Sequence, residues 1–286
     1  MSSTRAVRGG FSILGALALV TLLAAPAAAQ DPAASGPSLT VTGALDFTNQ
    51  YNFRGIRQNS EGISIWPYID FGIGAYTGEG ALKTVSVNLG MWNAFHSQID
   101  GFTNLDGKTT SNKWYEADYY ATLGLGFSKA ALAFNYTSYT SPADLFAHVK
   151  EAQIKLSVDD SAALGKSALK PYILLAFELS DDGQADAGVA KGKYLELGVA
   201  PGYAGSKASL AVPIKLGLSA GDYYEFGTGT DSKFGYFSIG GLVTVPMGAN
   251  LNIHFGGEFQ ALGDNLKAYN GQDTSGLVSA GLGFAF

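Results

Sequence analysis

The sequence predicts an all-β protein: a transmembrane antiparallel up-and-down β-barrel of about 12 strands that follows a cleaved signal peptide. Three observations lead to this fold class. Apolar residues alternate with polar or small ones along segments of about ten residues or more. Short and long connections alternate between those segments. The chain ends on an apolar strand, "LGFAF", without a polar tail.

The start of the chain has the organisation of a secretory signal peptide. Arg5 and Arg8 precede a short apolar run, and Ala27 and Ala29 fit the small-x-small rule of a cleavage site. The run is short for a membrane span, which disfavours the alternative of an N-terminal anchor. Cleavage after Ala29 leaves 286 − 29 = 257 residues with a net charge of 16 − 24 = −8. The predicted parts of the chain are the signal peptide (1–29), a periplasmic leader (30–38) and the barrel (39–286).

The composition supports one β-rich domain and excludes several functions. Charged residues make up 15% of the chain, which is below the usual quarter, and there are 38 glycines. The chain has no Cys, which excludes a disulfide framework and a lipid anchor on Cys. The negative charge disfavours a nucleic-acid partner.

The alternation is clearest in "ISIWPYIDFGIGAY" (63–76), where Ile and Phe share one face and Ser64, Trp66, Tyr68 and Asp70 the other. Strands of a soluble sandwich usually have about 5–6 residues. Strands of about 9–11 residues, apolar on one face and polar and Gly-rich on the other, are typical of membrane barrels. The sheet must close, because an unpaired backbone edge in hydrocarbon is too costly.

The predicted strands are 39–54, 63–76, 82–95, 113–127, 131–140, 146–157, 169–180, 193–204, 208–219, 233–246, 250–262 and 276–286. The shorter connections are 77–80, 128–130, 159–167, 205–208 and 248–250, and the others are mostly long and polar. Short turns face the periplasm in such barrels, so both termini are expected there and the long loops outside. Prolines at 67, 171, 201 and 213 fall inside predicted strands and lead us to expect bulges or strand ends there.

The C-terminal strand predicts how the barrel is assembled. Its last apolar residues on one face are Leu282, Phe284 and Phe286. A terminal Phe after alternating apolar residues resembles the signal that the β-barrel assembly machinery recognises. The last strand is also expected to pair with the first and close the barrel.

The segment "LDFTNQYNFRGIRQNSEGISIWPYIDFG" resembles the opening of the TorF-type putative porin family. The match consists of Tyr51, Phe53, Arg54, Gly55 and Ile56, about one tenth of the chain with its flanks. The second strand reads "IWPYIDFG" where a Gln-Gly-Gly is expected in that family. The resemblance implies an outer-membrane pore of ill-defined substrate.

The alternation assigns charged side chains to the lumen. The inward acids are Asp46, Asp70, Glu116, Asp118, Glu151, Glu178, Glu196 and Glu258, and the inward bases are Arg54, Lys155, Lys170 and Lys215. Acids on strands one, two and four would face lysines on strands six, seven and nine, which would give a transverse field across a narrow pore. The alternative is a lattice of ion pairs, for example between Glu196 and Lys215 across the 205–208 turn. Both interpretations remain open at this point.

One lumen hypothesis concerns the first two strands. If the loop between them is centred near Gln58 and Asn59, Asp46 and Asp70 lie nearly opposite each other without a base between them. Such acids would form the cation-attracting side of a constriction.

Enzyme and metal chemistry find little support. A barrel lipid hydrolase needs a Ser–His pair with an orienting group, and the three histidines are His96, His148 and His254. Only His148, near the outer rim with Ser138 on the next strand, offers such a pair. Acids in "DDGQADAG" (181–188) lack the spacing of a calcium loop and are expected in a solvated loop.

We therefore predict a porin that passes small hydrophilic solutes and mildly favours cations or neutral solutes. The expected partners are outer-membrane lipid, lipopolysaccharide, the assembly machinery and a small solute; no catalytic residue, cofactor or metal is expected. The alternative is a closed structural or adhesive barrel that acts through its loops. Tyr223, Tyr224 and Phe226 would then form a binding patch, or else a lid over the mouth or part of the aromatic belt.

Overall fold

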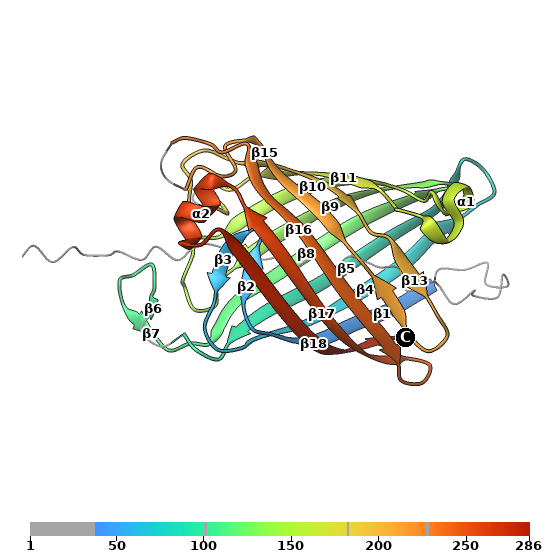
Figure 1. Ribbon diagram of the computed structural model, residues 1–286, viewed down its shortest axis with the longest axis horizontal. Helices are drawn as coiled ribbons and strands as arrows, with labels where there is room; N and C mark the ends of the chain where they lie inside the picture. The colour runs from blue at the N-terminus through green and yellow to red at the C-terminus, as the bar shows by residue number, and fades with distance from the viewer. Residues whose placement is uncertain (1–37, 100–101, 182, 227–228) are drawn as a thin grey trace, which may run out of the picture.

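The protein forms a closed antiparallel β-barrel (Figure 1). The computed structural model describes residues 38–99, 102–181, 183–226 and 229–286. The predicted signal peptide and nearly all of the leader lie outside these described residues. Strand β1 pairs with β18, so that Thr42 faces Ala285 and Thr48 faces Ser279, and this pairing closes the sheet.

The described residues hold twelve barrel strands, because two of the 14 sheet segments continue two others (14 − 2 = 12). The strands are β1 (Ser38–Thr48), β4 (Ser64–Thr77), β5 (Leu82–His96), β8 (Trp114–Phe127), β9 (Ala130–Thr140), β10 (Val149–Val158), β11 (Tyr172–Glu178), β12 with β13 (Lys193–Val199, Gly202–Ala204), β14 with β15 (Ser209–Ala211, Ile214–Gly221), β16 (Phe234–Pro246), β17 (Leu251–Leu262) and β18 (Thr274–Ala285). The predicted all-β fold class and the predicted strand number are confirmed.

The prolines lie at interruptions, as expected. Pro201 and Pro213 separate β12 from β13 and β14 from β15, and their carbonyls accept hydrogen bonds from Val212 and Gly240 (both 2.8 Å). Pro171 precedes β11. Pro67 remains inside β4, but the register of β4 with β5 skips it. The sheet therefore continues past residues that cannot donate to it.

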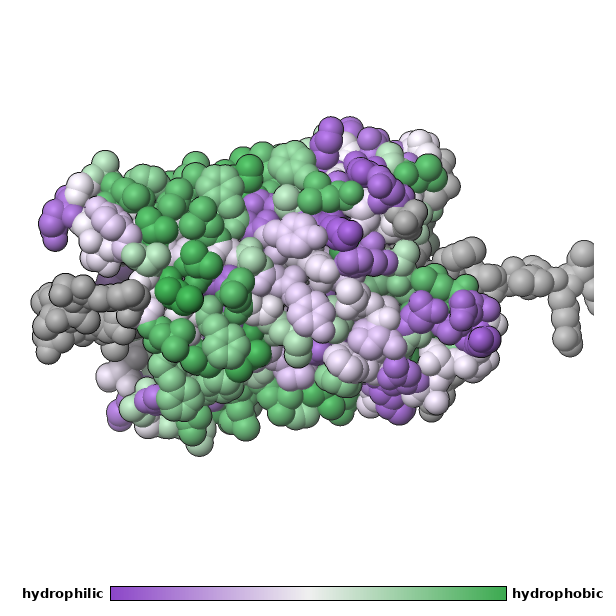
Figure 2. Space-filling model, turned by 180° about the vertical axis from the view of Figure 1, so that it is seen from behind, coloured by the Kyte–Doolittle hydropathy of each residue, from purple (hydrophilic) through white to green (hydrophobic). Residues whose placement is uncertain are grey.

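An apolar belt surrounds the barrel. The exposed outward side chains include Phe47, Phe71, Leu89, Phe134 and Ile154, and apolar residues cover much of the barrel wall in the space-filling view (Figure 2). Side chains that face lipid must be apolar, because hydrocarbon cannot solvate polar groups. Among the described residues, no helix is both long and apolar enough to cross a membrane, a finding that does not bear on strands.

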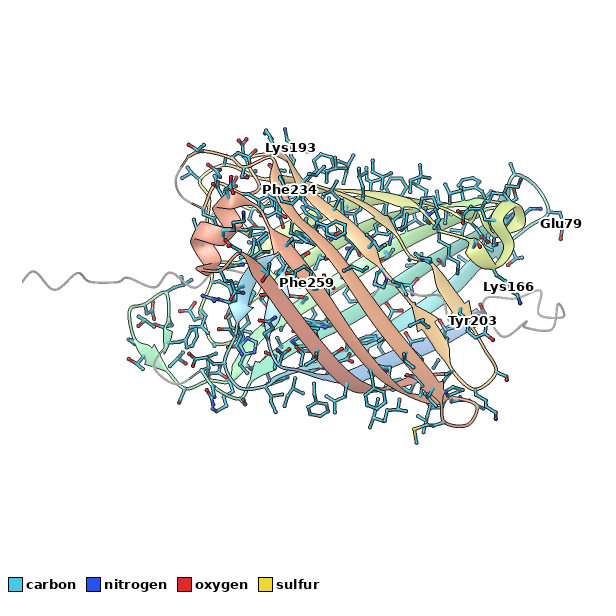
Figure 3. The ribbon with its side chains drawn as sticks, viewed as in Figure 1. Glu79, Lys166, Lys193, Tyr203, Phe234 and Phe259 are labelled. Atoms are coloured by element: carbon cyan, nitrogen blue, oxygen red, sulfur yellow. The ribbon has the colours of Figure 1, made fainter. Side chains whose placement is uncertain are left out.

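The two ends of the barrel differ. The turn end carries both ends of the described chain and the short connections; the loop end carries the long ones. The small elements are β6 (Phe102–Thr103), β7 (Thr109–Thr110) and α2 (Asp264–Asn270) at the loop end, and α1 (Ser161–Leu164) and the 3-10 helix η1 (Gly165–Ser167) at the turn end. Figure 3 shows Lys193 and Phe234 at the loop end and Glu79 and Lys166 at the turn end.

The prediction for the first strand is wrong beyond residue 48. Strand β1 ends at Thr48, and β2 (Tyr51–Phe53) pairs with β3 (Ile56–Asn59) in a separate two-stranded sheet. This unit, residues 51–59, is called the inner hairpin here, because it lies within the barrel near α2 (Figure 1). The segment predicted as an outer loop is therefore partly a strand inside the lumen.

The alternation also fails at one residue of β8. The register shifts between Ala94 and Phe95 of β5, which leaves Tyr115 as an extra residue between the partners Trp114 and Glu116. This bulge turns Tyr115 from the predicted lipid face into the interior, where it is 1% exposed.

The C-terminus is part of the closed sheet. Phe286 donates its backbone N–H to the Val41 carbonyl and accepts the N–H of Val41, both at 2.9 Å. The side chains of Leu282 and Phe286 are exposed, and the ring of Phe284 packs against Phe286 with 5.8 Å between centroids. The predicted pairing of the last strand with the first is confirmed. Recognition of these residues by the assembly machinery stays a prediction.

The asymmetry of the two ends gives a topology prediction. A tag at Gly107, an exposed residue of the loop end with open space around it, should be accessible to antibody on intact cells. A tag at Gly205, in a turn-end connection, should react only after the cells are opened. Gly183 is unsuitable for a tag, because it is buried against the carbonyls of Ala147 and His148. Reaction at Gly205 but not at Gly107 would reverse the orientation.

Candidate functional site: the barrel lumen and its inner hairpin

The inner hairpin fills the loop half of the lumen with aromatic side chains. Tyr51 is 0% exposed and its ring lies 5.2 Å from Trp66 and 5.6 Å from Trp92, both inward residues of the wall. Phe53 packs on Tyr139 with 6.0 Å between centroids. Edge-to-face and tilted contacts of this kind contribute about 0.5–1.5 kcal/mol each beyond the area they bury. The hairpin is thus packed as a core and not as a surface loop.

Arg54, at the tip of the inner hairpin, forms a buried ion pair with the barrel wall. Its two terminal nitrogens contact both carboxylate oxygens of Glu151, at 2.6 and 2.8 Å, and its Nη1 also donates to the Tyr223 hydroxyl at 2.6 Å. The guanidinium carbon lies 4.1 Å from the ring centroid of Tyr194 and 5.3 Å from that of Tyr223. The side chains of Arg54 and Glu151 are 8% and 1% exposed. Arg54 was predicted on strand one; it lies in the lumen, but on a hairpin turn.

The turn that presents Arg54 has an unusual backbone. Arg54 and Gly55 both have positive φ, 47° and 84°, as the tightest hairpin turns require. A Cβ on Gly55 would lie 2.7 Å from Leu266 of α2. Asn270 of α2 holds the same turn by donating to the Gly55 carbonyl (2.7 Å) and accepting from the Arg57 amide (3.0 Å). The loop that carries α2 therefore locks the hairpin tip.

Tyr223 and Tyr224 also hold the tip of the inner hairpin, which favours the interpretation of their segment as a lid over the mouth of the barrel. Both are buried, and the Tyr224 hydroxyl donates to the Arg54 carbonyl at 3.0 Å. Their segment is held by Asp186, whose Oδ2 accepts the N–H groups of Glu225 (2.6 Å) and Phe226 (3.0 Å). Asp186 is 1% exposed, so the expectation of a solvated acidic loop is wrong at this residue.

We expect the docking of residues 222–226 on Asp186 to depend on pH. Burial raises the pKa of its carboxyl to about 6 from 3.8, against the opposing effect of the N–H groups of Phe226, Gly188 and Glu225. Because the pKa is raised in the docked state, protonation of Asp186 stabilises docking of the segment that contains Tyr223 and Tyr224. This stabilisation is complete below pH 3.8, the pKa of the solvated carboxyl, and is lost as pH rises through 6. Between pH 7 and pH 5 the ratio of docked to released loop should rise roughly tenfold.

Hydrogen exchange of residues 183–190 and 222–226 at pH 5 and pH 7, corrected for intrinsic rates, measures this ratio. The Asp186→Asn variant should lose the part of the pH response that Asp186 causes. The Glu225 side chain, which also faces Asp186, is the same in both proteins. Protection that decreases on acidification in the wild type alone would contradict the prediction.

Three other predicted acids, Glu116, Asp118 and Glu178, point into the barrel and are buried. Glu116 accepts the Tyr51 hydroxyl at 3.0 Å, and it shares the buried inner face of β8 with Asp118. Neither of these two acids forms a salt bridge within the described part of the chain. Glu178 accepts the N–H groups of Ala185 (2.5 Å) and Gly192 (2.6 Å), which closes the loop after β11.

Further polar side chains of the wall point into the lumen, and several of them are paired. Lys215 Nζ pairs with Glu258 at 3.0 Å. Glu196 is diagonal to Lys215 in the register, as expected, but it instead accepts hydroxyls from tyrosines. These are Tyr172, Tyr194 and Tyr236, at 2.8, 2.6 and 3.0 Å.

The predicted pairing of Asp46 with Asp70 is wrong. Asp46 faces Trp66 and Asp70 faces Thr42 in the register of β1 and β4, because the connection contains the inner hairpin and is not a symmetrical loop. Asp46 instead contacts His254 Nε2 at 2.6 Å, and Asp70 accepts from Asn88 at 2.6 Å. The statement that no base lies beside these acids is therefore also wrong for Asp46.

The lysines do not form a continuous basic wall. Lys155 is inward, and its Nζ lies 4.2 Å from the ring centroid of Tyr172. Lys170 is exposed in the turn-end connection before β11, which begins three residues later than predicted. Arg54 pairs with Glu151 and Lys215 with Glu258, whereas Glu116, Asp118 and Lys155 form no salt bridge within the described residues. The inward charges therefore form neither two opposed walls nor a complete lattice of ion pairs.

Within the part of the chain that the structure describes, two Ser–His contacts occur near the loop end. Ser138 Oγ lies 2.7 Å from His148 Nε2 on the outer surface, and burial together with Lys150 lowers the pKa of His148. Ser64 Oγ lies 2.9 Å from His96 Nδ1, and both residues are buried in the interior. The first contact was expected from the sequence. The second depends on the register of β4 with β5, in which Ser64 faces His96, and no local pattern indicates it. Within the described residues, no group of three His, Cys, Asp or Glu residues is arranged to hold a metal ion.

Known proteins resemble this chain in structure alone. No family model and no curated protein matches the sequence. The outer membrane phospholipase A of Escherichia coli is 12% identical with a TM-score of 0.45, and covers 85% of this chain and 92% of its own. The NanC porin is 12% identical with a TM-score of 0.43, over 87% and 99% of the two chains. The translocator domain of the autotransporter NalP from Neisseria meningitidis is 14% identical with a TM-score of 0.44, over 90% of each. The closed barrel of this chain is established by its own strand pairing, and these similarities, all with TM-scores below 0.5, add nothing about its function.

Proposed function

We propose that this protein is a porin-like channel of the Gram-negative outer membrane that passes small hydrophilic solutes and has no enzymatic role. Its wall is a closed barrel with an apolar outer face, and its inner face is polar. The resemblance of residues 51–56 to the TorF-type porins, given above, points to the same function. The proposal extends to membership of that family.

The observation that carries the proposal is that several polar side chains of the lumen keep contact with water. The side chains of Asp46, His254 and Glu258 are 20%, 13% and 21% exposed although they point into the lumen. Charged groups that keep contact with water inside a barrel are typical of an aqueous channel. A barrel that served only as an anchor would gain more from a packed interior.

In the described conformation the loop half is narrowed by the inner hairpin. Passage of a solute would therefore require the hairpin to move, with α2 and the segment of Tyr223 and Tyr224 that hold it. We infer that the hairpin is the gate of the channel. Among the inward side chains acids outnumber bases, which favours cations or neutral solutes.

Conductance in planar bilayers tests this function. The purified wild type should show small or rare openings, and replacement of residues 51–59 by a short Gly-Ser turn should give a larger and steadier conductance. The same replacement of residues 102–110, in the exposed β6–β7 excursion, is the matched control and should behave like the wild type. A hairpin-free barrel that folds but never conducts would exclude the channel.

Ion selectivity tests which lumen acids act on a solute. In the hairpin-free barrel, Asp46→Asn together with Asp70→Asn should lower the preference for cations over anions, because it removes two inward carboxylates from the lumen. Reversal potentials in a salt gradient measure the change. Unchanged potentials would mean that these two acids only hold His254 and Asn88 in place.

The dense packing around the inner hairpin favours a second candidate, a closed barrel that acts through its loops. In that case the wild type and the hairpin-free barrel would both be silent in bilayers. Binding of outer loops to a partner would then be the function to test.

A further inference from the structure

The wall around Arg54 is built as a binding site for a planar cation. Of the groups that contact the guanidinium, Glu151 belongs to β10, Tyr194 to β12 and Tyr223 to the loop after β15. Only the Phe53 ring, 4.7 Å from the guanidinium carbon, comes from the hairpin itself. Nearly the whole site is therefore supplied by the barrel, and the hairpin supplies its occupant.

Two of the wall groups, Glu151 and Tyr194, are held in place by bonds that do not involve Arg54. Tyr139 donates to Glu151 Oε1 at 3.2 Å, and Gln153 donates to the same oxygen at 2.7 Å. The Tyr194 hydroxyl bonds to Glu196 at 2.6 Å and lies 2.9 Å from the hydroxyl of Tyr236, which fixes the plane of its ring. Glu151 and Tyr194 are thus preorganised and would keep their positions if the Arg54 side chain were absent, whereas Tyr223 completes the site while its segment stays docked on the hairpin.

The chemistry of the site selects one class of ligand. A carboxylate that faces two parallel N–H groups matches the fork of a guanidinium, and an aromatic face beside it matches the planar cation. An ammonium group would make only part of these contacts, and the buried Glu151 carboxylate would repel an anion. The match is therefore more specific than a general attraction for cations.

We propose that Glu151, Tyr194 and Tyr223 form a binding site for the guanidinium group of a solute, and that Arg54 occupies this site as an internal competitor. The use of this site by a solute that passes through the barrel rests on the proposed channel function. Because Arg54 is tethered, its effective concentration at the site is about millimolar or higher, so a free ligand cannot displace it easily. The site becomes measurable once Arg54 is removed.

The test uses Arg54→Ala in the full-length protein. This change adds no backbone strain, because Arg54 already carries a Cβ at its positive φ. L-arginine amide is the probe, and L-citrulline amide, an uncharged isostere of the side chain, is the matched control ligand. The temperature of unfolding in detergent is measured against the concentration of each.

L-arginine amide at millimolar concentration should raise the unfolding temperature of Arg54→Ala, with an apparent Kd at least tenfold lower than that of L-citrulline amide. The wild type and the Arg57→Ala variant, which loses the other hairpin arginine, should not respond. The double variant Arg54→Ala with Glu151→Gln should lose the response. If Arg54→Ala refolds poorly, its refolding yield with each amide gives the same comparison.

Equal responses to the two amides, or a response that survives in the double variant, would overturn the site. These binding measurements do not require the barrel to conduct, so they are independent of the bilayer experiments. Binding without conductance would retain the site and reject the channel. Conductance without selective binding would retain the channel and reject the site.

Discussion

Replacing Glu151 by alanine is expected to release the inner hairpin. The substitution leaves the buried guanidinium of Arg54 without its carboxylate, and removal of one partner from a buried ion pair costs about 3–5 kcal/mol. The 1% exposure of Glu151 means that water cannot compensate for the loss in place. Trypsin should then cleave after Arg54 and Arg57 much faster than in the wild type, while the barrel itself resists.

Two further variants separate charge from packing. The double variant Glu151→Ala with Arg54→Ala should recover part of the lost stability, because no unpaired charge remains buried. Lys155→Ala removes another inward charge of the same strand, one without a salt bridge in the described part of the chain, and should leave the hairpin protected. Cleavage of Glu151→Ala at the wild-type rate would show that the ion pair does not hold the hairpin.

Removal of Phe286 is expected to reduce assembly of the barrel several-fold. Its backbone makes two of the hydrogen bonds that join the last strand to Val41, and its side chain is 68% exposed on the lipid side. Loss of these bonds leaves Val41 unpaired at the end of the closing strand pair, and unpaired backbone groups in a membrane are costly. The amount of heat-modifiable protein in outer-membrane fractions measures the effect, together with the unfolded protein that remains in the periplasm.

Phe286→Lys should have a similar effect, because a charge on the lipid face opposes insertion. The matched control is Met247→Lys, which places the same charge at an exposed residue of a turn-end connection. Normal insertion of both Phe286 variants would show that assembly does not depend on Phe286 and that the rest of β18 is enough to close the barrel.

Much of the wall could be predicted because a strand repeats every two residues and lipid selects one face. Phe71 and Phe255 are lipid-facing, and Glu196 and Glu258 are inward, as the alternation indicates. Tyr115 deviates because a bulge depends on how two strands align, and neither strand encodes that alignment alone. Lys170 deviates because β11 starts later than its neighbouring apolar residues suggest.

The sequence indicates the face on which a side chain lies better than it indicates the partner of that side chain across the lumen. The contact between Asp46 and His254 joins residues 208 positions apart, and the contact between Arg54 and Glu151 joins residues 97 apart. Whether an acid lines a pore or completes a lattice depends on such distant partners. Periodicity places a side chain on a face but gives no information about what lies opposite.

The fold class, the number of strands, the lipid-facing belt and the closing role of the last strand could all be predicted from the amino-acid sequence. They follow from local alternation and from the requirement that every backbone group in a membrane be paired. Long-range contacts, in contrast, explain why residues 51–59 leave the wall and enter the lumen. The local pattern of "YNFRGI" is compatible with the end of a strand and with a hairpin. The hairpin is selected by Glu151, Tyr194 and Asn270, which close around its tip only when the barrel is complete.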